Sequence, residues 1–272
     1  MSETLIAAVI QLNSQEIVER NLSRARELAG AAAARGAKLL VLPENFAFMG
    51  PESDKRRLAE TIGDAAAPIQ RALADIARST ETVVIAGGMP TKAADPARPY
   101  NTTLVVDADG AVSASYHKLH LFDVDVDDGA SYRESRATTA GDEVVVTNVL
   151  GFAVGLSICY DLRFPELYRR MAAEGAECFV VPSAFTLTTG RDHWHPLLRA
   201  RAIESQCYVL AAAQWGRHPG ERVTFGHALI ADPWGTVVAE CPDGEGFALA
   251  ELDRSRLSRV RRALPCRDHR RF

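Results

Sequence analysis

Short runs of valine, isoleucine and leucine alternate with longer amphipathic stretches along this chain, and the alternation occurs twice. Aliphatic runs of this length are typical of buried strands, whereas the longer stretches have the period of helices. Each half of the sequence therefore predicts strand, helix, strand, helix and strand, followed by antiparallel strands. Such mixed connectivity favours an α/β fold in which two mixed sheets pack face to face between outer helices, a four-layer αββα sandwich.

The predicted elements can be placed by residue number. The first helix is expected to begin at Asn13 or Ser14 and to end before Gly36, a typical C-terminal cap. A second helix is predicted over 53–79 with a break near Pro68. The other predictions are strands at 4–11, 38–42, 82–86, 152–158, 178–181, 207–213 and 247–252, hairpins at 102–117 and 226–240, helices at 166–174 and 194–205, and a polar loop at 123–141. No linker rich in Gly, Pro or Ser interrupts this order, so residues 1–272 are interpreted as a single domain.

Composition argues against several classes of protein. A net charge of -4 does not fit a nucleic-acid-binding protein, which usually carries a basic domain or stripe. The N-terminal residues lack the pattern of a secretory signal, and no stretch approaches the roughly 18 apolar residues of a membrane helix. The five cysteines are widely spaced without a C-x-x-C pair, which fits free thiols in a reducing cytoplasm. The basic C-terminal run is interpreted as solvated or paired; it contains Arg261, Arg262, Arg267, Arg270 and Arg271.

Three predicted strands end in a polar residue that a purely structural core does not require. Glu44 follows an aliphatic run and a proline, Lys118 lies in an aromatic and aliphatic stretch, and Cys159 ends a buried strand. Each alone has a structural explanation, namely solvation, a lysine that reaches the surface, or a small buried thiol. Pro165 suits the first turn of a following helix, so Cys159 has the strand–turn–helix setting of an exposed nucleophile.

Together these three residues supply the groups that amide hydrolysis requires. A thiol needs a neighbouring base to become a nucleophile, and Glu44 can accept the proton of Cys159. The oxyanion that forms from an amide needs positive charge or N–H donors, and Lys118 can supply the charge. Their occurrence in one chain therefore predicts nucleophilic catalysis by Cys159.

The segments around these residues resemble the nitrilase superfamily of carbon–nitrogen hydrolases, whose signature is a Glu-Lys-Cys triad on an αββα sandwich. The matching pieces are Leu-Pro-Glu44, His-Lys118-Leu-His-Leu-Phe-Asp and Ile-Cys159-Tyr-Asp-Leu-Arg-Phe-Pro-Glu, and the likeness covers essentially the whole chain. It implies that Glu134 is the second glutamate of the family, which holds the lysine charged and in place. A surface carboxylate in a loop is the alternative for Glu134.

The residues after the nucleophile, Tyr160 to Arg163, resemble the amidase branches rather than nitrilases proper. Later segments, including Thr189–Trp194 and Ala211–His218, resemble the branch that hydrolyses deaminated glutathione. The resemblance implies hydrolysis of the terminal amide of deaminated glutathione, or of a related 2-oxo acid ω-amide, to the acid and ammonia through a thioester on Cys159. Alternatives are an ω-amidase acting on α-ketoglutaramate, an N-carbamoyl or aliphatic amide hydrolase and, more remotely, a non-catalytic scaffold dimer.

The implied substrate carries a carboxylate, so its pocket needs a cation. Arg163 is the candidate because a guanidinium can bind a carboxylate through two hydrogen bonds. A structural salt bridge at the start of a helix is the alternative for Arg163. Phe185 and Thr189 are expected to supply a wall and a hydroxyl, and a backbone N–H near Tyr160 to assist Lys118 at the oxyanion.

No metal or cofactor is predicted. His193 with His195, and His117 with His120, have spacings seen in metal sites, but no carboxylate or cysteine occurs in a matching register. The family likeness also implies chemistry that needs no cofactor. The expected partners are a small-molecule amide substrate and a second copy of the chain, which would pair through the two helices predicted beside the nucleophile.

Overall fold

The computed structural model describes residues 3–125 and 131–271, and within them the strands form two large sheets and one small one. The first large sheet has the order β13-β12-β1-β2-β3-β4-β5, and β16 also pairs with β1. Its strands are β1 (Thr4–Leu12), β2 (Leu39–Leu42), β3 (Val83–Thr91), β4 (Tyr100–Val106), β5 (Val112–His117), β12 (Ala213–Arg217), β13 (Val223–Phe225) and β16 (Gly246–Asp253).

The second large sheet has the order β15-β14-β11-β10-β9-β8. Its strands are β8 (Val146–Val149), β9 (Phe152–Leu156), β10 (Cys178–Val180), β11 (Tyr208–Ala211), β14 (Leu229–Ala231) and β15 (Val237–Glu240). The small sheet pairs β6 (Asp123–Asp125) with β7 (Ser131–Arg133). The α-helices are α1 (Val18–Ala34), α2 (Pro68–Thr80), α3 (Pro165–Ala173), α4 (Leu187–Ser205) and α5 (Arg254–Ala263), and the 3-10 turns are η1 (Glu52–Arg57), η2 (Glu134–Arg136), η3 (Cys159–Arg163) and η4 (Pro219–Glu221).

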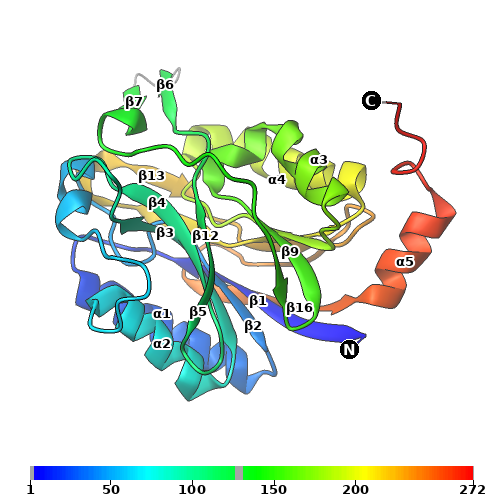
Figure 1. Cartoon of the computed structure of the whole chain (residues 1–272), viewed down its shortest axis with the longest axis horizontal. Helices are drawn as coiled ribbons and strands as arrows, with labels where there is room; N and C mark the ends of the chain where they lie inside the picture. The colour runs from blue at the N-terminus through cyan, green and yellow to red at the C-terminus, as the bar shows by residue number, and fades with distance from the viewer. Residues whose placement is uncertain (1–2, 126–130, 272) are drawn as a thin grey trace.

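The two faces of the first sheet bury different partners. Along β3, Val83 and Ile85 belong to the hydrophobic cluster shared with the second sheet, whereas Val84 and Ala86 belong to the cluster shared with α1 and α2. This division follows from the strand geometry, because neighbouring side chains point to opposite faces. The helices α3 and α4 lie on the far side of the second sheet (Figure 1). The order is therefore helices, sheet, sheet, helices, which confirms the predicted αββα sandwich.

The first helix begins later than the sequence predicts. It starts at Val18, because the side chains expected to cap it bond to distant segments instead. Asn13 Nδ2 donates to the carbonyl oxygen of Trp215 at 2.5 Å, and Ser14 Oγ donates to that of Phe46 at 3.0 Å. The two side chains predicted to cap the helix therefore form tertiary hydrogen bonds instead.

The predicted helix over 53–79 is wrong in its first half, where only the turn η1 forms before α2. Pro68 occupies the first position of α2, which suits its fixed φ angle and its missing N–H. The buried carboxylate of Glu60 accepts the free N–H groups of Ile69 at 2.6 Å and Gln70 at 3.0 Å. A capping side chain from the preceding segment therefore sets the start of α2.

The predicted polar loop at 123–141 contains regular structure. Its first part forms β6 and β7, and its residues 126–130 lie outside the described part of the chain. The turn η2 follows β7 directly and begins with Glu134. The small sheet therefore fixes where the predicted second glutamate enters the molecule.

The helix α4 begins at Leu187 rather than at residue 194 as predicted. Gly190, which disfavours a helix, is required by packing, since a Cβ there would come within 2.3 Å of the Phe225 side chain. Close contact between α4 and β13 thus explains why a glycine occurs in the first turns of α4, where the sequence pattern did not predict a helix. Among the described residues, no helix has the length and apolar character needed to cross a membrane.

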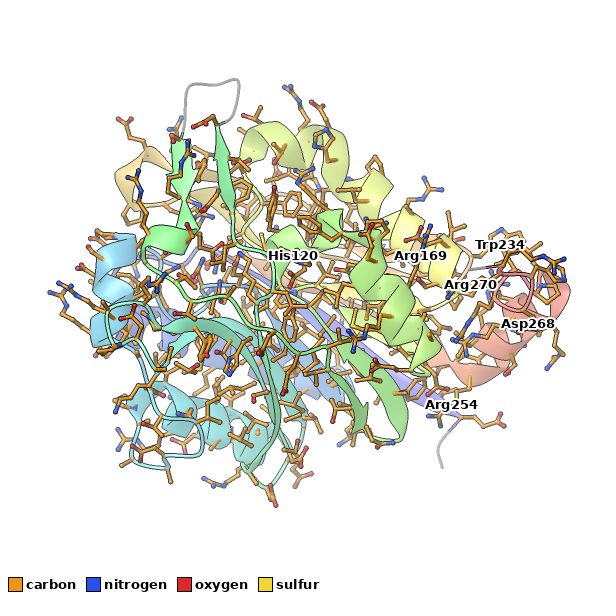
Figure 2. The ribbon with its side chains drawn as sticks, turned by 45° about the horizontal axis from the view of Figure 1, so that its top comes forward. His120, Arg169, Trp234, Arg254, Asp268 and Arg270 are labelled. Atoms are coloured by element: carbon orange, nitrogen blue, oxygen red, sulfur yellow. The ribbon has the colours of Figure 1, made fainter. Side chains whose placement is uncertain are left out.

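The C-terminal segment projects from one end of the molecule (Figure 1), and Figure 2 labels Asp268 and Arg270 there, in the same view as Trp234. Two arginines of the basic run anchor this segment. Arg261 donates to the carbonyl oxygen of Ala176, and Arg267 donates to that of Ala172. Part of the run therefore fastens the chain end to the helical layer.

Candidate functional site

Three strand ends from the two large sheets meet at one cavity. Glu44 follows β2, Lys118 follows β5, and Cys159 is the third residue after β9. All three line a cavity of about 720 Å³, a volume that includes its open mouth. Their exposed fractions are only 3%, 2% and 8%. The structure thus brings together the three residues that the sequence singled out.

Lys118 lies between two carboxylates. Its Nζ is 3.0 Å from Oε1 of Glu44, and it is 2.9 Å and 3.1 Å from the two oxygens of Glu134. Burial lowers the pKa of Lys118, but Glu134 and then Glu44 outweigh this effect and raise it well above its usual range. The lysine is therefore held as a buried ammonium ion. Removing one member of such a set leaves a buried charge without compensation.

Two donors that sequence reasoning missed hold Glu44 in place. Asn101 Nδ2 donates to Oε1 of Glu44 at 3.0 Å and to Oε1 of Glu134 at 3.1 Å, and the N–H of Ala184 donates to Oε2 of Glu44 at 3.0 Å. Burial alone would raise the pKa of Glu44, but the charge of Lys118 and two further cations lower it to about 2. Asn101 could have been suspected from the sequence, because it is a polar residue near the start of a strand that continues with aliphatic residues.

A pair of glycines lets the backbone approach Glu44. Gly88 has a φ of +68°, and a Cβ there would lie 2.5 Å from Cγ of Glu44. At Gly87 a Cβ would lie 2.0 Å from the ring of Pro182. The N–H of Asn45 donates to the carbonyl oxygen of Gly88 at 2.9 Å. Any side chain at these glycines would displace the carboxylate or the segment that holds it.

Cys159 occupies a strained backbone position. Its φ is 48°, in the left-handed region that costs a residue with a side chain about 1–2 kcal/mol. Its N–H donates to the carbonyl oxygen of Pro182 at 3.0 Å. Burial raises the pKa of the Cys159 thiol, and the charge of Glu44 raises it further, whereas Lys118 acts in the opposite direction. The resting side chain is therefore a thiol beside an ionised carboxylate.

Asp161 fastens the turn that carries Cys159, and sequence reasoning gave it no role. Its Oδ2 accepts the N–H of Ile158 at 2.8 Å and the hydroxyl of Tyr116 at 2.6 Å. Its Oδ1 accepts the N–H of His120 at 3.0 Å and lies 2.7 Å from Nδ1 of the same residue. Figure 2 labels His120 near the middle of the molecule. A fully buried carboxylate with four such contacts ties the turn to the segment around Lys118.

All four residues predicted to bind substrate line the same cavity. The guanidinium carbon of Arg163 lies 5.3 Å from the ring centre of Phe185. Thr189 Oγ1 is 2.8 Å from Thr186 Oγ1, and Tyr160 lies directly after the nucleophile. The expected wall, hydroxyl and cation, and the residue expected to supply the backbone N–H, therefore lie around one space.

The cavity carries more cations than carboxylates. Its lining includes three carboxylate residues, Glu44, Glu52 and Glu134, and five cations, Lys55, Lys118, Arg133, Arg163 and Arg222. Five minus three leaves two more cations than carboxylates in the lining, and one of the five, Arg133, is paired at 2.8 Å with Asp125, which lies outside the lining. Within the described residues, no carboxylate lies within ion-pair distance of Arg163, whose Nη1 is 3.3 Å from Nδ1 of His193. This arrangement suits an anionic ligand.

The histidine pairs noted in the sequence bond to different partners. His120 bonds to Asp161, and His193 lies beside Arg163. His195 instead lies 2.9 Å from a carboxylate oxygen of Glu240, which the fold brings to it from another element. The sequence contains no local register that would reveal this last contact.

Comparison with known proteins agrees with the geometry. The family model for carbon-nitrogen hydrolases matches residues 6–262. The chain belongs to the carbon–nitrogen hydrolase family. This hydrolase is 45% identical over 271 residues to a Synechocystis sp. protein named deaminated glutathione amidase, and the match covers 98% of each chain. It is 40% identical over 275 residues to a human protein of the same name, covering 99% of this chain and 83% of that one.

A solved structure shows the same likeness in three dimensions. Nit3 of Saccharomyces cerevisiae, a member of branch 10 of the nitrilase superfamily, aligns with a TM-score of 0.89 at 30% identity. The alignment covers all of this hydrolase and 98% of the yeast chain. The predicted family and fold are therefore confirmed, and the chain is a hydrolase that acts on amides. The individual roles of Glu44, Lys118, Glu134 and Cys159 stay predictions that rest on geometry.

Proposed function

We propose that this hydrolase cleaves the amide of an anionic 2-oxo acid amide, with deaminated glutathione as the preferred substrate. The observation that carries the proposal is the position of Arg163 in the cavity lining, where it has no carboxylate partner among the described residues. Relatives at 40% and 45% identity that are named deaminated glutathione amidase support the same substrate. α-Ketoglutaramate and other ω-amides remain its competitors.

The substrate's charges match those of the cavity. In deaminated glutathione the amide joins a 2-oxo acid to cysteinylglycine, so a carboxylate lies on each side of the scissile bond. Arg163 binds the 2-oxo carboxylate, and Arg222 faces the carboxylate of the departing dipeptide. The leaving amine is then cysteinylglycine, and not the ammonia expected from the sequence, which only a primary ω-amide releases.

The proposed reaction begins with a proton transfer. Glu44 takes the proton from Cys159 as the sulfur attacks the amide carbon, and the carbonyl becomes an oxyanion. Lys118 and the backbone N–H of Tyr160 stabilise that charge. Glu44 then protonates the departing amine, the carbon–nitrogen bond breaks, and a thioester remains on Cys159. Water that gives its proton to Glu44 adds to the thioester, and the acid leaves as the thiol reforms.

The electrostatics of the site explain why transfer and attack are coupled. Moving the proton from Cys159 to Glu44 replaces a carboxylate by a thiolate beside Lys118, so the net charge of the buried site does not change. The pKa of Glu44 is lowered to about 2, and that of Cys159 is raised, so a free thiolate does not accumulate at rest. Glu134 keeps Lys118 charged throughout, which supports its proposed role.

A substrate panel tests the proposal. Initial rates are measured with deaminated glutathione, α-ketoglutaramate, glutamine and an N-carbamoyl amino acid, following the acid, ammonia and cysteinylglycine. We expect the highest kcat/KM with deaminated glutathione. A higher value with α-ketoglutaramate, glutamine or the N-carbamoyl amino acid would refute the substrate assignment, although not the amidase chemistry.

The variant Arg163→Met tests how the substrate is held. Loss of a charge-assisted hydrogen bond costs about 1.5–3 kcal/mol, or about 10- to 150-fold in binding. We expect KM to rise by that factor for anionic 2-oxo acid amides and to change little for a neutral aliphatic amide. Arg191→Met is the matched control, because Arg191 is an exposed arginine of α4 outside the cavity. Equal effects of both variants would exclude a specific role for Arg163.

We further propose that two copies of the chain pair through α3 and α4, the two helices predicted beside the nucleophile. Ile203 on α4 and Trp234 in the β14–β15 turn are 47% and 53% exposed, and a Cβ at Gly235 beside Trp234 would meet Ile203. Light scattering is expected to show a dimer that Ile203→Glu dissociates. The control Leu150→Glu changes an equally exposed residue, 45%, in the turn between β8 and β9. A monomeric wild-type protein would refute the pairing.

We also propose that residues 1–272 form one domain that works in the cytoplasm. The hydrophobic cluster that includes both large sheets and α3 and α4 supports a single unit. Four buried cysteines without disulfides support a reducing compartment. Limited proteolysis that releases two stable halves would contradict the single domain.

A further inference from the structure

A second group of metal-ligand side chains converges outside the catalytic cavity. His195 comes from α4, His227 precedes β14, and Glu240 ends β15. Nε2 of His195 lies 2.9 Å, and Nδ1 of His227 lies 2.8 Å, from the same Oε1 of Glu240. The three donor atoms all lie within 4.8 Å of one another. We propose that these three side chains bind one Zn²⁺ ion.

The donor set and its spacing suit this ion. Two imidazole nitrogens and one carboxylate oxygen are a known set for Zn²⁺, which completes its tetrahedron with water. Bond lengths of about 2.0–2.1 Å place tetrahedral donors about 3.3 Å apart. The nitrogen–oxygen distances of 2.8 and 2.9 Å must therefore increase by about half an ångström to reach the spacing of about 3.3 Å between tetrahedral donors. Glu240 can move by this amount, since its side chain is 34% exposed.

The structure orients His227 before any ion arrives. Its backbone has a φ of 57°, and its carbonyl oxygen accepts the indole N–H of the fully buried Trp194 at 2.8 Å. Its ring stacks on Phe225 with centres 4.5 Å apart and planes 29° apart. The direction of Nδ1 is therefore set by packing, which lowers the ordering that ion binding requires.

Both ring nitrogens of His227 face carboxylates, and this is the feature that favours an ion. Nδ1 lies 2.8 Å from Glu240, and Nε2 lies 3.5 Å from Oδ1 of Asp243. A neutral imidazole has a single N–H, so one nitrogen would present its lone pair to a carboxylate oxygen. With Zn²⁺ on Nδ1, the Nε2–H donates to Asp243, the carboxylate–histidine–zinc order that tunes many metal sites.

A zinc ion at this site would stabilise the fold and would take no part in the reaction. None of its three ligands lines the catalytic cavity. A bound ion would cross-link α4 to the β14–β15 hairpin, and α4 carries Thr189, which does line the cavity. The expected consequence of Zn²⁺ is therefore a higher melting temperature, because a ligand that binds only the folded state stabilises it.

Titration calorimetry with zinc chloride on the chelator-treated protein, freed of any affinity tag, tests the site. We expect one ion per chain. His195→Ala and Glu240→Gln each remove a ligand from a partly exposed position, so both should fold. Loss of a residue that only hydrogen-bonds to a metal ligand typically weakens metal binding by about 10- to 100-fold, and Asp243→Asn should have an effect of this size. Each of the two ligand variants should weaken zinc binding by more than this. His269→Ala is the matched control, because His269 is an exposed histidine in the C-terminal segment.

The outcomes decide whether the cluster of His195, His227 and Glu240 binds zinc. Binding of one ion that both ligand variants weaken by more than about 100-fold, with His269→Ala unchanged, supports the zinc site. No stoichiometric binding by the wild-type protein would overturn the proposal. Unchanged affinity in both ligand variants would do the same. Cobalt substitution gives an independent reading, because a tetrahedral site should show a visible ligand-field spectrum that His195→Ala removes.

Discussion

Replacing Lys118 by methionine separates what this buried lysine does for the fold from what it does for the reaction. Its Nζ lies 3.0 Å from Glu44 and 2.9 Å from Glu134, and the side chain is 2% exposed. Without it, two carboxylates share one buried site in which both accept from the same amide group of Asn101. Breaking a buried ion pair from one side costs about 3–5 kcal/mol. At about 2 °C per kcal/mol for a chain of this size, the melting temperature should fall by about 6–10 °C.

The same substitution should remove most of the catalytic activity. Loss of one oxyanion donor typically costs about 2.7–4 kcal/mol, or about 100- to 1000-fold in kcat. Calorimetry gives the change in melting temperature, and initial rates with deaminated glutathione give the change in kcat. Both are measured on the same preparation, so that unfolded protein is not counted as inactive enzyme.

The double variant Lys118→Met with Glu134→Gln is the matched control. It removes one charge of each sign, so Glu44 remains the single carboxylate of the set and much of the lost stability should return. The kcat should stay low, because the oxyanion still lacks its cation. Near wild-type turnover in the double variant would refute the catalytic role of Lys118. A single variant as stable as the wild type would refute the buried ion-pair argument.

Three further predictions concern the nucleophile and its surroundings. Cys159→Ala should show no turnover and no acyl adduct by mass spectrometry; an adduct in this variant would place the nucleophile elsewhere. Asp161→Asn removes charge-assisted hydrogen bonds worth about 1.5–3 kcal/mol each from the turn that carries Cys159, so kcat should fall at least about 10-fold with little change in KM, and a change confined to KM would contradict a positioning role. The profile of kcat/KM should be level between about pH 5 and 8, because a pKa of about 2 keeps Glu44 ionised there. An activity limb centred near about pH 6–7 would contradict the assignment of this pKa to Glu44. Because the pKa is lowered on folding, the stability that Glu44 contributes is fully present above its ordinary pKa of 4.5 and is lost as the pH falls toward 2.

Much of the fold follows from local patterns. Aliphatic runs and helical periods predict the strands and most helices, because burial on a sheet or a helix face imposes those periods directly on the sequence. The candidate catalytic residues Glu44, Lys118 and Cys159 stand out for the same reason. Each interrupts an apolar pattern at a strand end, and although each alone has a structural explanation, the three together indicate a catalytic site.

Other features depend on contacts between distant segments, and local patterns do not reveal them. Ala184 donates to Glu44 across 140 positions, and Asn101 bonds to it across 57. The start of α1 is likewise decided by a bond from Asn13 to Trp215 across 202 positions.

The motif around Cys159 was therefore legible in the sequence alone, whereas the hydrogen bonds that hold it, the charge of its cavity and the cluster of His195, His227 and Glu240 arise only on folding. The physical reason is that a hydrogen bond depends on the distance between two atoms in space, and residues far apart along the chain have no fixed distance until the sheets pack.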